Sequence, residues 1–145
     1  MKKKLLTVDY LFKKYPNLFR GKDLSMRETA MCWGIECGSG WYGIIDELCA
    51  KIQAHCEENG YDDVMFSQCK EKYGTLRVYV NFGSDEIYAY IDVAQEKSSH
   101  VCELCGSKRG TLRSDRGWYM TRCKKCWTKY NKDADDRLAL INGEK

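Results

Sequence analysis

Cys102-Glu103-Leu104-Cys105 and Cys123-Lys124-Lys125-Cys126 are two Cys-x-x-Cys pairs separated by seventeen residues, and they decide how the rest of the chain is interpreted. Each pair supplies two thiolates, and the segment between them is long enough to form a small β-ribbon. Four thiolates at this spacing are typical of a closed tetrahedral zinc site. We therefore predict one structural Zn²⁺ bound by Cys102, Cys105, Cys123 and Cys126, in a C-terminal four-cysteine zinc ribbon.

Chance spacing and disulfides are the alternative explanations of these cysteines. Chance would have to place two correctly spaced pairs in a chain with nine cysteines. Disulfides are disfavoured because the number of cysteines is odd and Asp9 interrupts the apolar run that a secretion signal would need. No stretch approaches the roughly 20 apolar residues of a membrane span. We expect a protein of the reduced bacterial cytoplasm, without membrane contact.

The net charge of +3 conceals a segregation of charge along the chain. Residues 31–99 carry five Lys and Arg against twelve acids, whereas residues 100–132 carry nine against two. A basic module joined to an acidic body indicates either an anionic partner for the module or attraction between the two parts. We predict an α+β body over residues 1–98 and a zinc-ribbon module with a closing helix over residues 99–145.

Apolar spacing and capping residues predict helices at both ends of the chain. The first begins with Thr7 as its cap and stops before Pro16, and a closing helix is expected from Trp127 to about Ile141. Residues 85–94 are ambiguous. Ser84 can cap a helix there, but the apolar residues also alternate as in a third strand.

A long helix is expected in the middle of the body, from about Trp41 to Asn59. Ser39 is its expected cap, and Gly60 follows its last turn. Its apolar stripe places Cys49 and Cys56 in the core, where a free cysteine behaves as a small hydrophobic residue.

Two alternating segments, residues 64–70 and 75–82, flank Glu71-Lys72-Tyr73-Gly74 and predict a β-hairpin. The body would then be a hairpin, or short antiparallel sheet, with two to three helices. The residues expected to face inward are Leu76, Val78, Val80 and Phe82. Those expected on the opposite face are Arg77, Tyr79 and Asn81.

Catalysis is not favoured by the residue types present. HNH nucleases use four-thiolate zinc as a scaffold, but they need histidines on the element between or after the cysteine pairs. The histidines of this chain are His55 and His100, which both precede Cys102. A degenerate HNH-like nuclease therefore remains only an alternative. Four thiolates also close the coordination of zinc, so the ion could not activate water.

Basic and aromatic side chains alternate within and after the loop that joins the cysteine pairs. This combination is typical of surfaces that follow a phosphate backbone and stack on bases. Small ribbons are, however, mostly surface and often rich in Lys and Arg without any ligand. The candidate ligand-binding residues are Arg109, Arg113, Arg116, Trp118, Arg122 and Lys124.

A second candidate is the glycine-rich run before the long helix. Backbone N–H groups of Gly38 and Gly40 could form an anion-binding nest, with Trp41 stacking on a base. The run lacks the lysine of a phosphate-binding loop. The competing interpretation is a tight turn that needs glycine, with Trp41 in the core.

Three motifs in order resemble a family of small phage and prophage proteins with a C-terminal four-cysteine zinc ribbon. They are Cys32-Trp33-Gly34-Ile35-Glu36-Cys37-Gly38-Ser39-Gly40-Trp41-Tyr42, Lys70-Glu71-Lys72-Tyr73-Gly74-Thr75-Leu76-Arg77, and Cys102-Glu103-Leu104-Cys105-Gly106 followed by Gly117-Trp118. The resemblance implies a non-enzymatic accessory protein of a bacterial virus that acts in counter-defence or host takeover. It carries no residue-level function.

Three binding classes remain open. A nucleic-acid-binding module would use the basic ribbon. A nucleotide-binding protein would use an aromatic and basic pocket, for example from Trp41, Arg77 and Tyr79, often at a homo-oligomer interface. An inhibitor of a host defence protein would use an apolar or acidic face of the body. The favoured hypothesis is a phosphate-bearing ligand, either nucleic acid or nucleotide.

Overall fold

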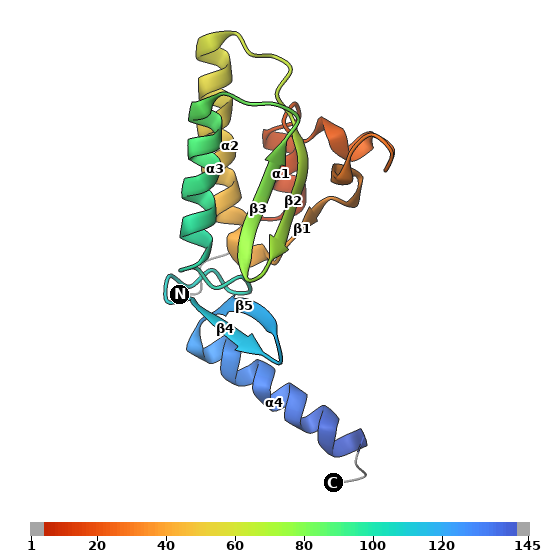
Figure 1. Cartoon of the computed structure of the whole chain (residues 1–145), viewed down its shortest axis with the longest axis vertical. Coiled ribbons are helices and arrows are strands. Elements are labelled where there is room, and N and C mark those ends of the chain that lie inside the picture. The colour runs from red at the N-terminus through yellow and green to blue at the C-terminus, as the bar shows by residue number, and fades with distance from the viewer. Residues whose placement is uncertain (1–4, 142–145) are drawn as a thin grey trace.

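A computed structural model describes residues 5–141, apart from the side chain of Asp135. These residues form an α+β fold with four α-helices, a mixed three-stranded sheet and a separate two-stranded hairpin (Figure 1). In chain order the elements are α1 (Val8–Lys14), β1 (Ile35–Glu36), α2 (Tyr42–Asn59), β2 (Phe66–Lys72), β3 (Thr75–Val80), α3 (Asp85–Ser98), β4 (Thr111–Asp115), β5 (Trp118–Arg122) and α4 (Lys124–Ile141). None of the helices in the described part of the chain is long and apolar enough to span a membrane.

The predicted hairpin is confirmed as β2 and β3, with Lys72 opposite Thr75. The two residues of its turn, Tyr73 and Gly74, both have positive φ, 53° and 83°. A two-residue loop with this conformation is a type I′ turn, whose twist matches that of the strands. The short strand β1 was not predicted. It pairs parallel to β2 and makes the sheet mixed, with the order β1-β2-β3.

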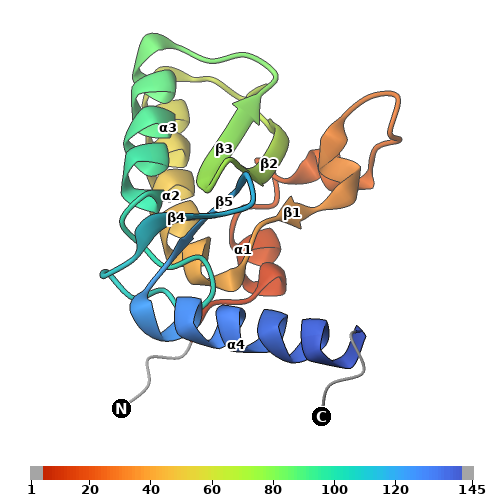
Figure 2. The same ribbon diagram turned by 60° about the horizontal axis from the view of Figure 1, so that its bottom comes forward.

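Helices α2 and α3 lie side by side and pack against the sheet (Figures 1 and 2). Cys49 and Cys56 of α2 are buried in this core, which confirms the predicted apolar stripe. Leu76 and Val78 of β3 are buried from the other side. The prediction for Phe82 was wrong. Since β3 ends at Val80, alternation no longer fixes this ring, which is 47 % exposed.

The ambiguous segment 85–94 is helical. The Ser84 hydroxyl accepts a hydrogen bond from the Ile87 N–H, as an N-cap does, and Asp85 and Glu86 occupy the first turn. Ile87 and Ile91 face the core at helical spacing. A capping side chain and acids near the helix dipole therefore outweigh the strand-like alternation.

The start of α2 differs from the prediction. Ser39 does not cap the helix with its side chain, because Ser39–Trp41 form a 3₁₀ turn and α2 begins after Trp41. The far end agrees with the prediction. Gly60 ends the helix in the left-handed conformation, with φ of 70°.

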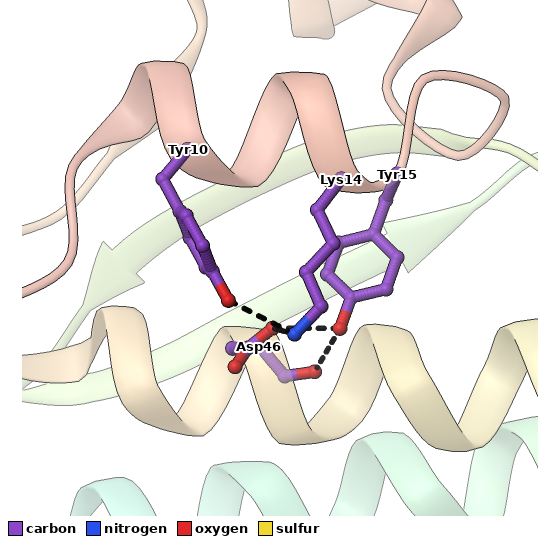
Figure 3. Close-up of polar contacts among 4 residues, drawn as sticks. All are labelled: Tyr10, Lys14, Tyr15 and Asp46. Carbon is purple, nitrogen blue, oxygen red and sulfur yellow. Dashed lines mark hydrogen bonds and ion pairs between the residues drawn. The ribbon is translucent and has the colours of Figure 1, made fainter.

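Helix α1, capped by Thr7 as predicted, is joined to α2 by a polar cluster (Figure 3). Lys14 Nζ lies 3.0 Å from both the Tyr10 hydroxyl and Asp46 Oδ1, and the Tyr15 hydroxyl donates to the same carboxylate at 2.6 Å. Burial, followed by the hydrogen bond to Asp46, raises the pKa of Tyr15 to about 12. The cluster fixes α1 on the outside of α2.

The C-terminal part consists of the β4–β5 hairpin and α4, which extends away from the body (Figure 1). Its turn residues Arg116 and Gly117 also have positive φ, 52° and 87°. The closing helix starts at Lys124, three residues before the predicted Trp127. The Trp127 N–H already donates to the Cys123 carbonyl at 2.9 Å, so the second cysteine pair lies at the helix start.

Candidate metal centre and basic surface

The four predicted metal ligands come together from three segments. Cys102 and Cys105 lie in the turn between α3 and β4, Cys123 directly follows β5, and Cys126 lies in the first turn of α4. Their Sγ atoms all lie within 4.8 Å of one another. In the described part of the chain, this is the one such gathering of three or more cysteine, histidine or carboxylate ligands.

The spacing of the sulfur atoms fits metal coordination better than a disulfide. Cys105 Sγ and Cys123 Sγ are 3.7 Å apart. Tetrahedral zinc with Zn–S bonds of about 2.3 Å places its sulfur ligands about 3.8 Å apart, whereas disulfide sulfurs are about 2.05 Å apart. All four thiols are free. They can therefore occupy the corners of one tetrahedron without moving far.

The backbone of the first cysteine pair is folded tightly around this centre. The Gly106 N–H donates to the Cys102 carbonyl at 2.9 Å, and the Cys102 N–H donates to the Ser107 carbonyl at 2.8 Å. Gly106 has φ of 78°, a left-handed conformation that glycine adopts without strain. The turn thus holds Cys102 and Cys105 on the same side.

The thiols differ in acidity, for reasons visible in the fold. Burial opposes ionisation of Cys102, but backbone N–H groups of Cys105, Cys123 and Leu104 point at its sulfur and lower its pKa to about 7. Burial and then the neighbouring thiols raise the pKa of Cys126 to about 12. One thiolate is favoured and further ones repel each other, so the full set of thiolates needs a cation among them.

The anion nest predicted at Gly38 and Gly40 is filled by the chain itself. The Gly38 N–H donates to the Glu103 carboxylate at 2.8 Å, and the Gly40 N–H donates to the Glu103 carbonyl at 2.7 Å. A Cβ on Gly40 would collide with the Cys102 carbonyl oxygen. These glycines are therefore needed for close approach of the first cysteine pair, and we withdraw them as ligand-binding candidates.

Trp41 is also withdrawn as a ligand-binding residue, because its side chain is fully buried. Its indole N–H donates to the Val101 carbonyl at 2.7 Å. Nearby, the buried Thr121 hydroxyl donates to the Gly74 carbonyl, and the Glu103 N–H donates to the Thr121 carbonyl. Buried hydrogen bonds thus join the metal centre, the β4–β5 hairpin and the turn of the β2–β3 hairpin.

The six basic and aromatic candidates between Arg109 and Lys124 divide into two groups. Arg113 and Arg122 are half-buried and lie over the rings of Trp127 and Tyr130, at 5.7 and 5.6 Å, so they pack α4 against the hairpin. The remaining four are exposed and free of such packing: Arg109, Arg116, Trp118 and Lys124.

Positive charge exceeds negative charge over residues 100–132, which carry nine Lys and Arg against two acids. The two carboxylates of residues 100–132 have structural partners: Glu103 binds the Gly38 N–H, and Asp115 accepts from the Tyr130 hydroxyl at 3.0 Å. None of the nine Lys and Arg of the same segment forms an ion pair with a carboxylate of the described residues.

Sequence reasoning missed a cleft of about 400 Å³ between the tips of the two hairpins, which we call the hairpin-tip cleft. The rings of Tyr73 and Tyr119 meet edge to face across it at 6.5 Å. Tyr73 and Tyr119 could each be placed at or beside a turn from the sequence, but no local sequence pattern indicated that the two turns are neighbours. The residues that form the cleft include Lys72, Tyr73, Arg116, Gly117, Trp118 and Tyr119.

Arg77 and Tyr79, the last two candidates, lie on the outer face of β3. Tyr79 is 43 % exposed, and Arg77 is half-buried with its Nε donating to Thr75 Oγ1 at 3.0 Å. The histidines lie elsewhere. His55 Nε2 is 3.0 Å from Ser84 Oγ, and His100 Nε2 is 3.2 Å from a Glu96 carboxylate oxygen.

Comparison of the chain with protein-family models, with curated proteins and with solved structures finds no match.

Proposed function

We propose that Cys102, Cys105, Cys123 and Cys126 bind one structural Zn²⁺, which makes the β4–β5 hairpin and the start of α4 a zinc ribbon. The observation that supports zinc is the gathering of four free thiols within 4.8 Å. Thiolates are ligands that zinc prefers, and four of them close its coordination sphere. The ion would then stabilise the fold and take no part in a reaction.

We also propose that the protein is a non-enzymatic binding protein for nucleic acid. The supporting observation is a row of basic side chains that crosses from one hairpin to the other, which we call the basic track: Lys70, Lys72, Arg77 and Arg116. Lys70 lies opposite Arg77 in the register of β2 and β3, and Lys72 follows two residues later on the same face. Lys72 and Arg116 line the hairpin-tip cleft together.

A row of four cations can bind successive phosphates of one strand, and phosphate contact supplies most non-specific affinity for nucleic acid. The setting that we propose, from the resemblance to small phage proteins, is counter-defence or takeover of a bacterial host. Binding to nucleic acid is one way in which such an accessory protein would act.

Metal content is tested by elemental analysis of the purified protein. We expect one zinc per chain, and a strongly reduced content in Cys126→Ser. Cys32→Ser is the matched control, because Cys32 is also free and half-buried but lies outside the cluster. Zinc content near zero in the wild-type protein would contradict the proposed centre.

Nucleic-acid binding is tested by titrating a fluorescent oligonucleotide at several salt concentrations. The affinity should fall with salt, with a log–log slope of about −0.7 per phosphate contacted on a single strand. Arg116→Glu should weaken binding and make the slope shallower by about one contact, whereas Lys13→Glu on α1 should change neither. No binding to any oligonucleotide at low salt would refute the nucleic-acid proposal and leave the zinc proposal standing.

A further inference from the structure

We propose that the hairpin-tip cleft is a stacking site for the unpaired bases of single-stranded nucleic acid. The inference rests on the proposed nucleic-acid function and names the form of ligand that this surface takes. Three aromatic rings gather at the cleft, and all are open to solvent: Trp118 is 74 % exposed, Tyr73 is 65 % exposed and Tyr119 is 46 % exposed.

The exposure of these rings is unfavourable for an isolated protein. Large aromatic side chains normally bury 150–250 Å² each, and adjacent exposed rings indicate a surface that is covered by a partner. Tyr73 and Tyr119 touch only edge to face, so the broad faces of the rings are not used on each other. Flat, apolar bases can occupy such faces, and stacking of this kind tolerates any base sequence.

The residue types at the two hairpin turns also support a stacking site. Each type I′ turn has the form X-Gly, and the X position has a left-handed φ that favours glycine, asparagine or aspartate. The chain instead places Tyr73 at one of these positions and Arg116 at the other, with φ of 53° and 52°. A ring for a base and a guanidinium for a phosphate thus stand at the tips of neighbouring hairpins, although both choices strain the backbone.

The basic side chains around the cleft match a nucleic-acid strand, with its successive phosphates, better than a single base. Lys72 Nζ lies 5.6 Å from the centre of the Tyr73 ring, and the basic track continues along the hairpin through Lys70 and Arg77. The acid that also lines the cleft, Glu71, accepts a hydrogen bond from the Gly74 N–H at 2.7 Å, so its carboxylate is held at the turn.

A single strand presents both groups that this surface would contact, because its bases are not enclosed in a duplex. Aromatic side chains stack on unpaired, splayed bases, whereas the faces of paired bases are covered by their neighbours in the helix. A duplex would therefore meet only the basic track. This predicts a preference for single strands that depends on the rings.

The test compares Trp118→Ala with Trp33→Ala, because Trp33 is also exposed, at 64 %, but lies before β1 and outside the cleft. Binding of fluorescent oligo-dT and oligo-U, and of a duplex of equal length, is measured at one salt concentration. We expect Trp118→Ala to weaken binding to both single strands roughly 5-fold to 100-fold. Its duplex affinity, and every affinity of Trp33→Ala, should change less than about twofold.

Folding of each variant is verified by its zinc content and melting temperature. Trp118→Phe, which keeps a stacking ring, should recover most of the affinity and so excludes a general folding defect. Stacking should also quench tryptophan fluorescence when a single strand binds, and this quenching should be lost in Trp118→Ala.

Three results would overturn the inference. One is equal affinity for duplex and single strand. Another is unchanged single-strand affinity in Trp118→Ala when Arg116→Glu still weakens it, which would leave the proposed phosphate contacts intact without a stacking site. The third is a mononucleotide that binds as tightly as the oligonucleotide, because the basic track should gain affinity from several phosphates.

Discussion

Replacing Tyr73 with asparagine should make the protein more stable and weaken its binding to single strands. Tyr73 has φ of 53°, and the left-handed conformation costs an L-residue about 1–2 kcal/mol. Asparagine is several-fold enriched there because its short polar side chain hydrogen-bonds locally. The turn should therefore relax without changing its shape.

The expected gain in stability is the relief of backbone strain less the stabilisation that the contacts of the Tyr73 ring provide. It is 65 % exposed and makes an edge contact with Tyr119 and a cation–π contact with Lys72. Exposed contacts of this kind are at the weak end of their ranges, about 0.5 kcal/mol each and so about 1 kcal/mol together. Asparagine should thus add up to about 1 kcal/mol to the free energy of unfolding. For a chain of this length, a gain of about 1 kcal/mol raises the melting temperature by roughly 2–4 °C.

Thermal unfolding in zinc-containing buffer measures this, with Tyr73→Ala as the matched control. Alanine removes the same ring but keeps the strained φ, so it should lower the melting temperature slightly. Both variants should bind oligo-dT more weakly than the wild-type protein. A lower melting temperature for Tyr73→Asn would show that the ring stabilises the fold, and the argument from strain would fail.

Three further outcomes are expected. Gly40→Ala should lower the melting temperature by several degrees, because its Cβ would collide with the Cys102 carbonyl. Gly43→Ala is the control and should raise the melting temperature slightly, because the space around its Cβ is open. Similar melting temperatures for the two variants would contradict the close approach of Gly40 to the first cysteine pair. Chelation of zinc should lower the melting temperature and expose the β4–β5 hairpin to protease, and an unchanged digestion pattern would contradict a structural ion. The pKa of Tyr15 is raised to about 12 from 10, so the stability that this hydroxyl contributes is complete below pH 10 and is lost as the pH rises toward 12. Tyr15→Phe should therefore show a shallower loss of melting temperature over that range, and parallel curves would contradict the raised pKa.

Elements specified by neighbouring residues could be predicted from the sequence. Thr7, Ser84 and Gly60 each act within a turn of their own helix, and the β2–β3 hairpin is closed by a two-residue loop. The short strand β1 could not be predicted, because two residues carry no periodic signal and their pairing partner lies more than thirty positions away.

The glycine-rich run shows why the candidate site was only partly predictable. The Gly38 N–H does bind an anion, as the nest interpretation predicted, but Trp41 lies in the core, as the competing interpretation predicted. That anion is Glu103, which lies between the cysteines of the first pair and sixty-five positions along the chain from Gly38. No local pattern could indicate that these two segments are in contact. Similarly, the sequence could not distinguish Arg113 and Arg122 from the exposed arginines, because they pack against rings of α4 that only the structure places beside them.

The shape of the hairpin-tip cleft depends on the cysteine centre through a buried hydrogen bond. One wall comes from the β2–β3 turn and the other from the β4–β5 turn. The second wall is held against the first by the hydrogen bond from Thr121 to the Gly74 carbonyl, and Thr121 lies two residues before Cys123. If zinc fixes Cys123, it also fixes the spacing of the two sets of rings. A zinc-free protein should then lose the preference for single strands before it loses all affinity, because the basic side chains of the body remain while the stacking surface separates.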